Sequence, residues 1–208
     1  MSIPPFARAE LRKWHTGAEW KPRTTAWLDE LACKYGKENF RLRKGPGGPY
    51  VKVVCEELLP MANLLHGVPD LREWQGSLAP PGAKADAWLR ASPQHLPQPV
   101  QIVGAFNGAE FAKQMKELNA HGRTDTQVTS AIEIEGVQNE YVVKAIEKKK
   151  AKGYPSDYWL LVAIDDIYRP VEELELLTAE AVAAATGAQF QRVYIAGMNS
   201  GSGARRLA

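Results

Sequence analysis

Cysteine and long apolar runs are both scarce in this sequence. The two cysteines, Cys33 and Cys55, are too few for a disulfide framework or a cysteine-based zinc site. The longest strongly apolar run covers seven residues, 158–164, whereas a membrane-spanning helix needs about 20. The N-terminal residues also lack the apolar core of a secretory signal peptide. These absences predict a cytoplasmic protein without a membrane partner.

A strong excess of one charge sign is also missing. The chain has 26 Lys and Arg residues against 24 Asp and Glu residues, for a formal net charge of +2. Residues 1–44 are more basic, with ten Lys and Arg against five Asp and Glu. This local excess would suit a lobe that faces nucleic acid, and an ordinary solvated surface explains it as well. Charge alone therefore leaves the partner open.

The apolar patterns that are present predict an α/β domain with a mixed central sheet flanked by helices. We expect helices over residues 22–35, 51–67, 108–122, 142–152 and 170–186. We expect strands over residues 86–90, 100–106, 131–136, 158–164 and 190–197. The unbroken apolar run at 158–164 predicts a central strand that is buried on both faces. The alternation at 131–136 predicts an exposed strand or hairpin arm.

The lysine-rich helix carries one lysine on its apolar face. On a helical wheel of ~100° per residue, Lys149 falls within the stripe formed by Val142, Ala145 and Ile146, and Lys148 flanks it. In one interpretation the stem of Lys149 packs on the sheet and its ammonium group reaches water beyond the edge. In the other, the ammonium group serves a functional site.

Three blocks occur in a recognisable order: residues 84–89 (KADAWL), 100–106 (VQIVGAF) and 145–166 (AIEKKKAKGYPSDYWLLVAIDD). Together they resemble the PD-(D/E)xK superfamily of restriction-endonuclease-like nucleases. Residues 107–122 and 145–166 are similar to an uncharacterised bacterial subgroup with a degenerate active-site motif. The resemblance implies a restriction-endonuclease-like α/β core over residues 49–197. A basic helical N-terminal extension (1–48) and a flexible tail (198–208) would flank this core.

The resemblance also implies a site for Mg²⁺ in which carboxylates hold the ion and a lysine acts beside it. Asp86 matches the first carboxylate. Gln101 stands where relatives have glutamate, and Val103 stands where the full motif has lysine. Gln101 offers a metal an amide oxygen without charge, so Mg²⁺ affinity should fall. Some superfamily members carry the lysine on the helix behind the sheet, which points to Lys149, with Lys148 as the alternative.

Relatives often place a further metal-tuning glutamate on the leading helix, and Glu57 is the candidate metal ligand there. Its neighbour Glu56 lies at a similar angle from the apolar stripe, so a plain solvated pair is the competing interpretation. Glu133 and Glu135, on the expected hairpin arm, are alternative replacements for the missing carboxylate.

Two functions follow from the resemblance as hypotheses. The first is a Mg²⁺-dependent nuclease that acts on DNA or RNA and is weakened or inactive because of Gln101. The alternative is a non-catalytic module that keeps the nuclease fold and binds nucleic acid or a protein. Nucleic acid is thus the expected partner, and a homodimer is left open.

Overall fold

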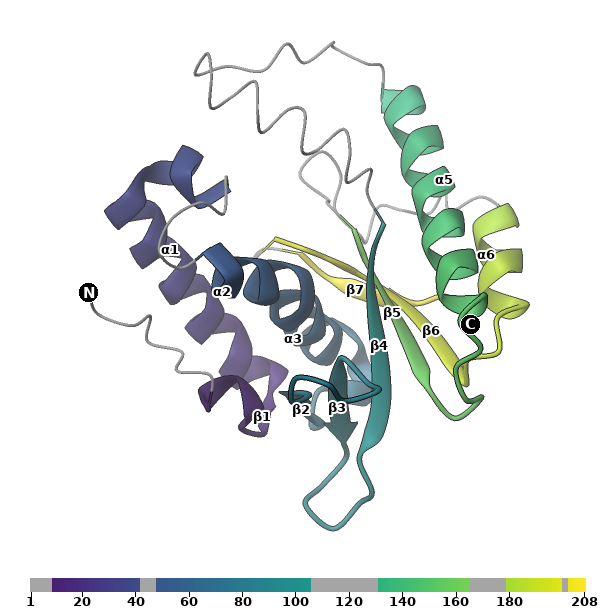
Figure 1. The fold of residues 1–208 in the computed structure, drawn as a ribbon, viewed down its shortest axis with the longest axis horizontal. Helices are drawn as coiled ribbons and strands as arrows, with labels where there is room; N and C mark the ends of the chain where they lie inside the picture. The colour runs from purple at the N-terminus through teal and green to yellow at the C-terminus, as the bar shows by residue number, and fades with distance from the viewer. Residues whose placement is uncertain (1–8, 42–47, 106–130, 165–178, 200–201) are drawn as a thin grey trace.

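The computed structural model describes residues 9–41, 48–105, 131–164, 179–199 and 202–208 (Figure 1). These residues contain a sheet whose seven strands lie side by side in chain order. The strands are β1 (His15–Thr16), β2 (Gln75–Leu78), β3 (Ala87–Arg90), β4 (Gln98–Ala105), β5 (Trp159–Ile164), β6 (Arg192–Gly197) and β7 (Ala204–Arg206). The helices are α1 (Gly17–Arg41), α2 (Gly48–Val53), α3 (Leu59–Gly67), α5 (Ala131–Lys150) and α6 (Ala179–Thr186), with a π-helical turn η2 (Val54–Leu58) and two 3₁₀ turns, η1 (Glu10–Arg12) and η3 (Pro69–Leu71).

The sheet is mixed, as predicted. Strands β4, β5 and β6 run parallel to one another. Strands β1 to β4 form an antiparallel series, and β7 pairs antiparallel with β6. The α/β class with a mixed sheet flanked by helices is therefore confirmed.

Helices cover both faces of the sheet (Figure 1). Helices α1 and α3 pack with one face, and α5 and α6 pack with the other. Strand β5 is buried along its whole length, which confirms the prediction for the run at 158–164. Alternate side chains of β5 enter the two layers: Trp159, Leu161 and Ala163 on the α3 side, and Leu160, Val162 and Ile164 on the α5 side.

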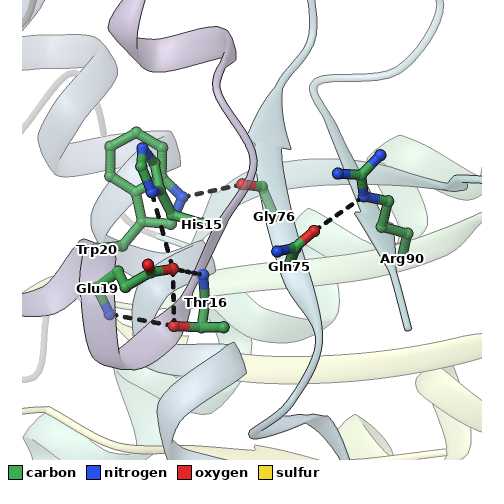
Figure 2. A network of polar contacts seen from close by, with 7 residues as sticks. All are labelled: His15, Thr16, Glu19, Trp20, Gln75, Gly76 and Arg90. Atoms are coloured by element: carbon green, nitrogen blue, oxygen red, sulfur yellow. Dashed lines mark hydrogen bonds and ion pairs between the residues drawn. The ribbon is translucent and has the colours of Figure 1, made fainter. Parts of the chain in front are cut away.

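The start of α1 is defined by a reciprocal cap (Figure 2). Glu19 Oε2 accepts a hydrogen bond from Thr16 N at 2.8 Å, and Thr16 Oγ1 accepts one from Glu19 N at 3.3 Å. This is the capping-box arrangement of a Thr followed three residues later by Glu. The next residue, Trp20, donates its indole N–H to Gly76 O of β2 at 2.9 Å. Trp20 and Trp27 are buried in the core cluster that contains α3 and β3 residues, so α1 is built into this layer.

Residues 51–67 are helical, as predicted, and a π-helical turn lies just before Pro60. Proline lacks the N–H that would bond to the carbonyl of Glu56, and its ring would collide with that carbonyl in a regular helix. The wider turn over Val54–Leu58 removes this collision. It also places Glu57 on a segment whose geometry differs from that of an ordinary helix.

Two predictions about elements are wrong. Residues 131–136 form the first turns of α5 and no strand, so Glu133 and Glu135 lie on a helix. Six residues span fewer than two helical turns, and their period-two pattern did not outweigh the helical pattern of the residues that follow. Residues 198–208 are not simply a flexible tail, because Ala204–Arg206 pair with β6 as strand β7.

Two predicted helices lie outside the described residues, wholly or in part. The helix expected at 108–122 falls within 106–130, which the structure does not describe. The helix expected at 170–186 is described only from Ala179 to Thr186, and this part is helical.

Trp20→Phe should lower the free energy of unfolding by about 2–4 kcal/mol. The variant leaves the buried carbonyl of Gly76 without its indole donor and also leaves unfilled volume. Urea denaturation checks this, with Trp14→Phe as the matched control, since Trp14 is only half-buried. Equal destabilisation by the two variants would contradict the importance given to the Trp20–Gly76 hydrogen bond.

Candidate functional site

The candidate site begins with Asp86, which lies at the edge of the sheet where β3 starts. Asp86 N donates to Val100 O at 3.0 Å. Its carboxylate oxygen Oδ2 accepts a hydrogen bond from Ile102 N at 2.8 Å. The side chain thus accepts a backbone N–H of β4 at a position just beyond the last β3–β4 pair, Ala87–Val100. A hydrogen-bonded carboxylate is held in one orientation, so this position suits an anchor for other groups.

Gln101 comes from the next strand and points to the opposite layer from its neighbours. Val100 and Ile102 enter the core with α3, and side chains alternate along a strand. Gln101 therefore faces α5, where its side chain is buried.

Lys149 reaches these two residues from the last turn of α5. Its Nζ donates to Gln101 Oε1 at 2.7 Å and to Asp86 Oδ2 at 3.2 Å. The residue is only 9% exposed, and it lies on the same stripe as the buried Val142 and Ile146. The side chain therefore ends on polar partners inside the protein, and the interpretation in which it simply reaches water is wrong.

The amide of Gln101 makes a hydrogen bond at each end. Oε1 accepts from Lys149, and Nε2 donates to the backbone carbonyl of Lys84. Lysine can only donate and a carbonyl can only accept, so these two partners determine the orientation of the amide. A glutamate here could keep the bond to Lys149 but would turn an acceptor oxygen toward the acceptor of Lys84. This chain therefore uses Gln101 as a neutral link.

Burial and Asp86 act in opposite directions on Lys149. Burial lowers the pKa of the Lys149 ammonium group, and the nearby Asp86 carboxylate raises it, with burial the stronger effect. The ring of Tyr154 adds a further contact, with its centroid 5.5 Å from Nζ. Gly153, with a φ of 64°, turns the chain after α5 and brings Tyr154 back to this position.

The other lysine and strand positions named by the resemblance are not in this cluster. Lys148 is exposed. Val103 is half-buried and packs against the α5 layer as an ordinary apolar residue. Sequence reasoning missed Tyr154 and the Lys84 carbonyl as partners, since neither residue type carries a signal for this role.

Glu57 approaches the site from the layer opposite to Lys149. Burial, followed by the charge of Asp86 and then that of Glu56, raises the pKa of Glu57 to about 7. Glu57 is half-buried on the π-helical turn. The competing interpretation, in which it belongs to a plain solvated pair, does not describe this position. Glu57 and Asp86 both line a hollow of about 500 Å³, called the edge hollow below. Its remaining lining residues are Leu11, Arg12, Val53, Leu78, Ala79, Pro80, Pro81, Gly82, Ala83 and Ala85.

The donors fit Mg²⁺ in kind but carry little charge. Asp86 and Gln101 offer the oxygen ligands that Mg²⁺ prefers, and Mg²⁺ sites often use one or two carboxylates together with substrate phosphates. However, Lys149 offsets the charge of Asp86, so the cluster of Asp86, Gln101 and Lys149 is neutral overall. In the described part of the chain, no group of three or more His, Cys, Asp or Glu residues could hold a metal ion. A neutral cluster offers a cation little net electrostatic attraction.

Comparisons with family models, with curated proteins and with solved structures found no match for this chain. The resemblance to the PD-(D/E)xK nucleases therefore stays a hypothesis that rests on the sequence blocks. Among the described residues, no helix combines the length and the apolar character that crossing a membrane requires.

Glu57→Gln should stabilise the protein at pH 8 by about 1–2 kcal/mol, allowing for partial solvent exposure, and should have little effect near pH 4. The folded-state pKa lies above the ordinary value of 4.5, so the native state retains a proton that the unfolded chain releases. The stability of the natural protein should therefore fall as the pH rises from about 4.5 through about 7.

Urea denaturation at several pH values checks this expectation. Glu56→Gln on the same turn is the control and should change the pH dependence much less, because the charge of Glu56 contributes less to the raised pKa of Glu57 than burial and Asp86 do. If the natural protein and Glu57→Gln differed by the same amount at pH 4 and pH 8, Glu57 would not be the titrating group.

Proposed function

We propose that this protein acts on nucleic acid as a weakened Mg²⁺-dependent phosphodiesterase of the PD-(D/E)xK type, with its site at Asp86, Gln101 and Lys149. The observation that carries the proposal is the position of Lys149. A lysine from the helix behind the sheet meets the carboxylate and the amide at the strand edge, with its Nζ 3.2 Å from Asp86 and 2.7 Å from Gln101. This is the arrangement that the resemblance requires of a lysine displaced from the strand.

Each residue has a distinct role in this proposal. Asp86 and the amide oxygen of Gln101 would hold Mg²⁺, which would polarise a phosphate and favour the ionised form of a bound water. Lys149 offers a positive charge to the phosphate oxygens, where negative charge grows during cleavage. Because Lys149 is buried and already hydrogen-bonded, its ammonium group needs little reorganisation to meet that charge. Tyr154 packs beside the ammonium group and limits its movement.

A second candidate function is a non-catalytic module that binds nucleic acid or a protein. The hydrogen bond from Gln101 Nε2 to the Lys84 carbonyl favours it. A residue whose two ends are both used structurally behaves as a link in the fold, and the neutral cluster then serves to hold Lys149 for binding. The two functions differ in whether Mg²⁺ has any effect.

Lys149→Met should weaken nucleic-acid binding and keep the fold. Methionine preserves most of the packing of the stem, while the charge offered to a phosphate is lost. Affinity for a short oligonucleotide should fall, and the slope of log K against log salt concentration should decrease by about one. Fluorescence anisotropy at several salt concentrations measures both. Lys148→Met, at the exposed neighbour, is the matched control. If the two variants changed the affinity and its salt dependence equally, the role of Lys149 would be purely structural.

Gln101→Glu should strengthen Mg²⁺ binding, because it adds a charged oxygen ligand to the neutral cluster. The gain should be on the order of 1–3 kcal/mol, by analogy with hydrogen bonds to charged groups. Isothermal titration calorimetry measures the affinity, and cleavage of a plasmid or a single strand should rise with it. Without Mg²⁺ the variant should be less stable than the natural protein, because its carboxylate faces the Lys84 carbonyl.

The double variant Gln101→Glu, Asp86→Ala should lose both the gain in Mg²⁺ affinity and the gain in cleavage. If Gln101→Glu leaves Mg²⁺ binding unchanged, the non-catalytic module is the better account. Oligonucleotide binding that depends on Lys149 but is insensitive to Mg²⁺ would identify nucleic acid as the partner of that module.

A further inference from the structure

The edge hollow has the size and lining of a site for a small organic ligand. Its volume of about 500 Å³ lies within the range of typical ligand pockets, ~300–1,000 Å³. Nine of its twelve lining residues are nonpolar, and the polar three are Arg12, Glu57 and Asp86. An apolar cavity with a few polar groups is the usual composition of a small-molecule site, in which the polar groups provide specificity.

One wall of the edge hollow is a tight turn, which makes the cavity preformed. Ala83 N donates to Pro80 O at 3.0 Å, and Gly82 has a φ of 84°. Proline at the second position and a positive-φ glycine at the third are the features of a type II turn. The fixed φ of Pro81 restricts this wall further. Little ordering is then needed when a ring packs against it.

The polar groups of the hollow select the kind of ring. A carboxylate accepts two parallel hydrogen bonds from adjacent N–H donors. Guanine carries two adjacent donors, N1–H and the N2 amino group, on its base-pairing edge. Adenine and cytosine each have a single amino donor beside an acceptor nitrogen, so they match a carboxylate less well. Arg12 is exposed beside the hollow and offers a counter-charge to a phosphate outside it.

We propose that the edge hollow binds a guanine base, with Glu57 accepting hydrogen bonds from its base-pairing edge and Arg12 facing its phosphate. This inference rests on the proposed function and names the nucleotide that the site prefers. Asp86 joins the two sites, because it lines the hollow and also accepts a hydrogen bond from Lys149. A guanine nucleotide in the hollow therefore places the adjoining phosphate of a strand next to the Lys149 cluster.

The test compares guanosine monophosphate, adenosine monophosphate and inorganic phosphate by calorimetry on the full chain. Guanosine monophosphate should bind about tenfold more tightly than adenosine monophosphate, and inorganic phosphate should bind most weakly. Glu57→Gln should remove the preference for guanine, whereas Glu56→Gln should retain it. Ala83→Trp, at an exposed position in the turn, should fill the hollow and weaken the binding of both nucleotides. Thermal melting of each variant confirms that it folds.

Equal affinity for the two nucleotides would overturn the inference, as would an equal loss of preference in Glu57→Gln and Glu56→Gln. These results are separable from a failure of the proposed function. If the nucleotides bind equally while Lys149→Met still weakens oligonucleotide binding, the hollow is no base site and the proposed function stands. If the preference for guanine depends on Glu57 while Lys149→Met has no effect on oligonucleotide binding, the hollow is a guanine site and the proposed role of Lys149 is wrong.

Discussion

The constraint on which this site depends is the burial of a charged ammonium group. Lys149 lies on the apolar stripe of α5 and is 9% exposed, so its charge must be met by partners within the protein. Asp86 supplies the opposite charge, and Gln101 supplies a neutral acceptor. Strand β4 continues to Ala105, beyond its last pair with β3 at Val100, and this leaves room for Asp86 beside it. The start of β3, the middle of β4 and the end of α5 therefore meet around a single side chain.

The same edge brings the two helical layers together. Lys149 arrives from the α5 side, and Glu57 arrives from the π-helical turn on the α3 side. Asp86 lies between them and acts on both, since its charge raises the pKa of Lys149 and also that of Glu57. A change in charge at Asp86 should therefore be felt in both layers. This coupling is electrostatic and needs no movement of the helices.

Long, strongly patterned elements could be predicted from the sequence, and the partners of individual polar atoms could not. The apolar run of β5 and the stripe that contains Lys149 each follow from a simple period. Residues 131–136 were too few to separate a strand from a helix, and the pairing of β7 depends on contacts distant in sequence. The position of Lys149 on its wheel was predictable, but the bond from Gln101 to Lys84 depends on a loop whose path no local pattern specifies. The edge hollow likewise requires the π-helical turn, the η1 turn and the Pro80–Ala83 turn to meet.

Gln101 is the residue at which the two candidate functions separate physically. A glutamate would give the cluster a net negative charge, which attracts a metal cation and pairs more strongly with Lys149. The amide instead keeps the cluster neutral and donates a hydrogen bond to the Lys84 carbonyl. This backbone group is therefore not left without a partner. Stability without a cation and affinity for a cation are therefore opposed at this position. A chain that carries glutamine here favours the fold in the absence of metal, and under the proposed function the positive charge offered to a phosphate then comes mainly from Lys149.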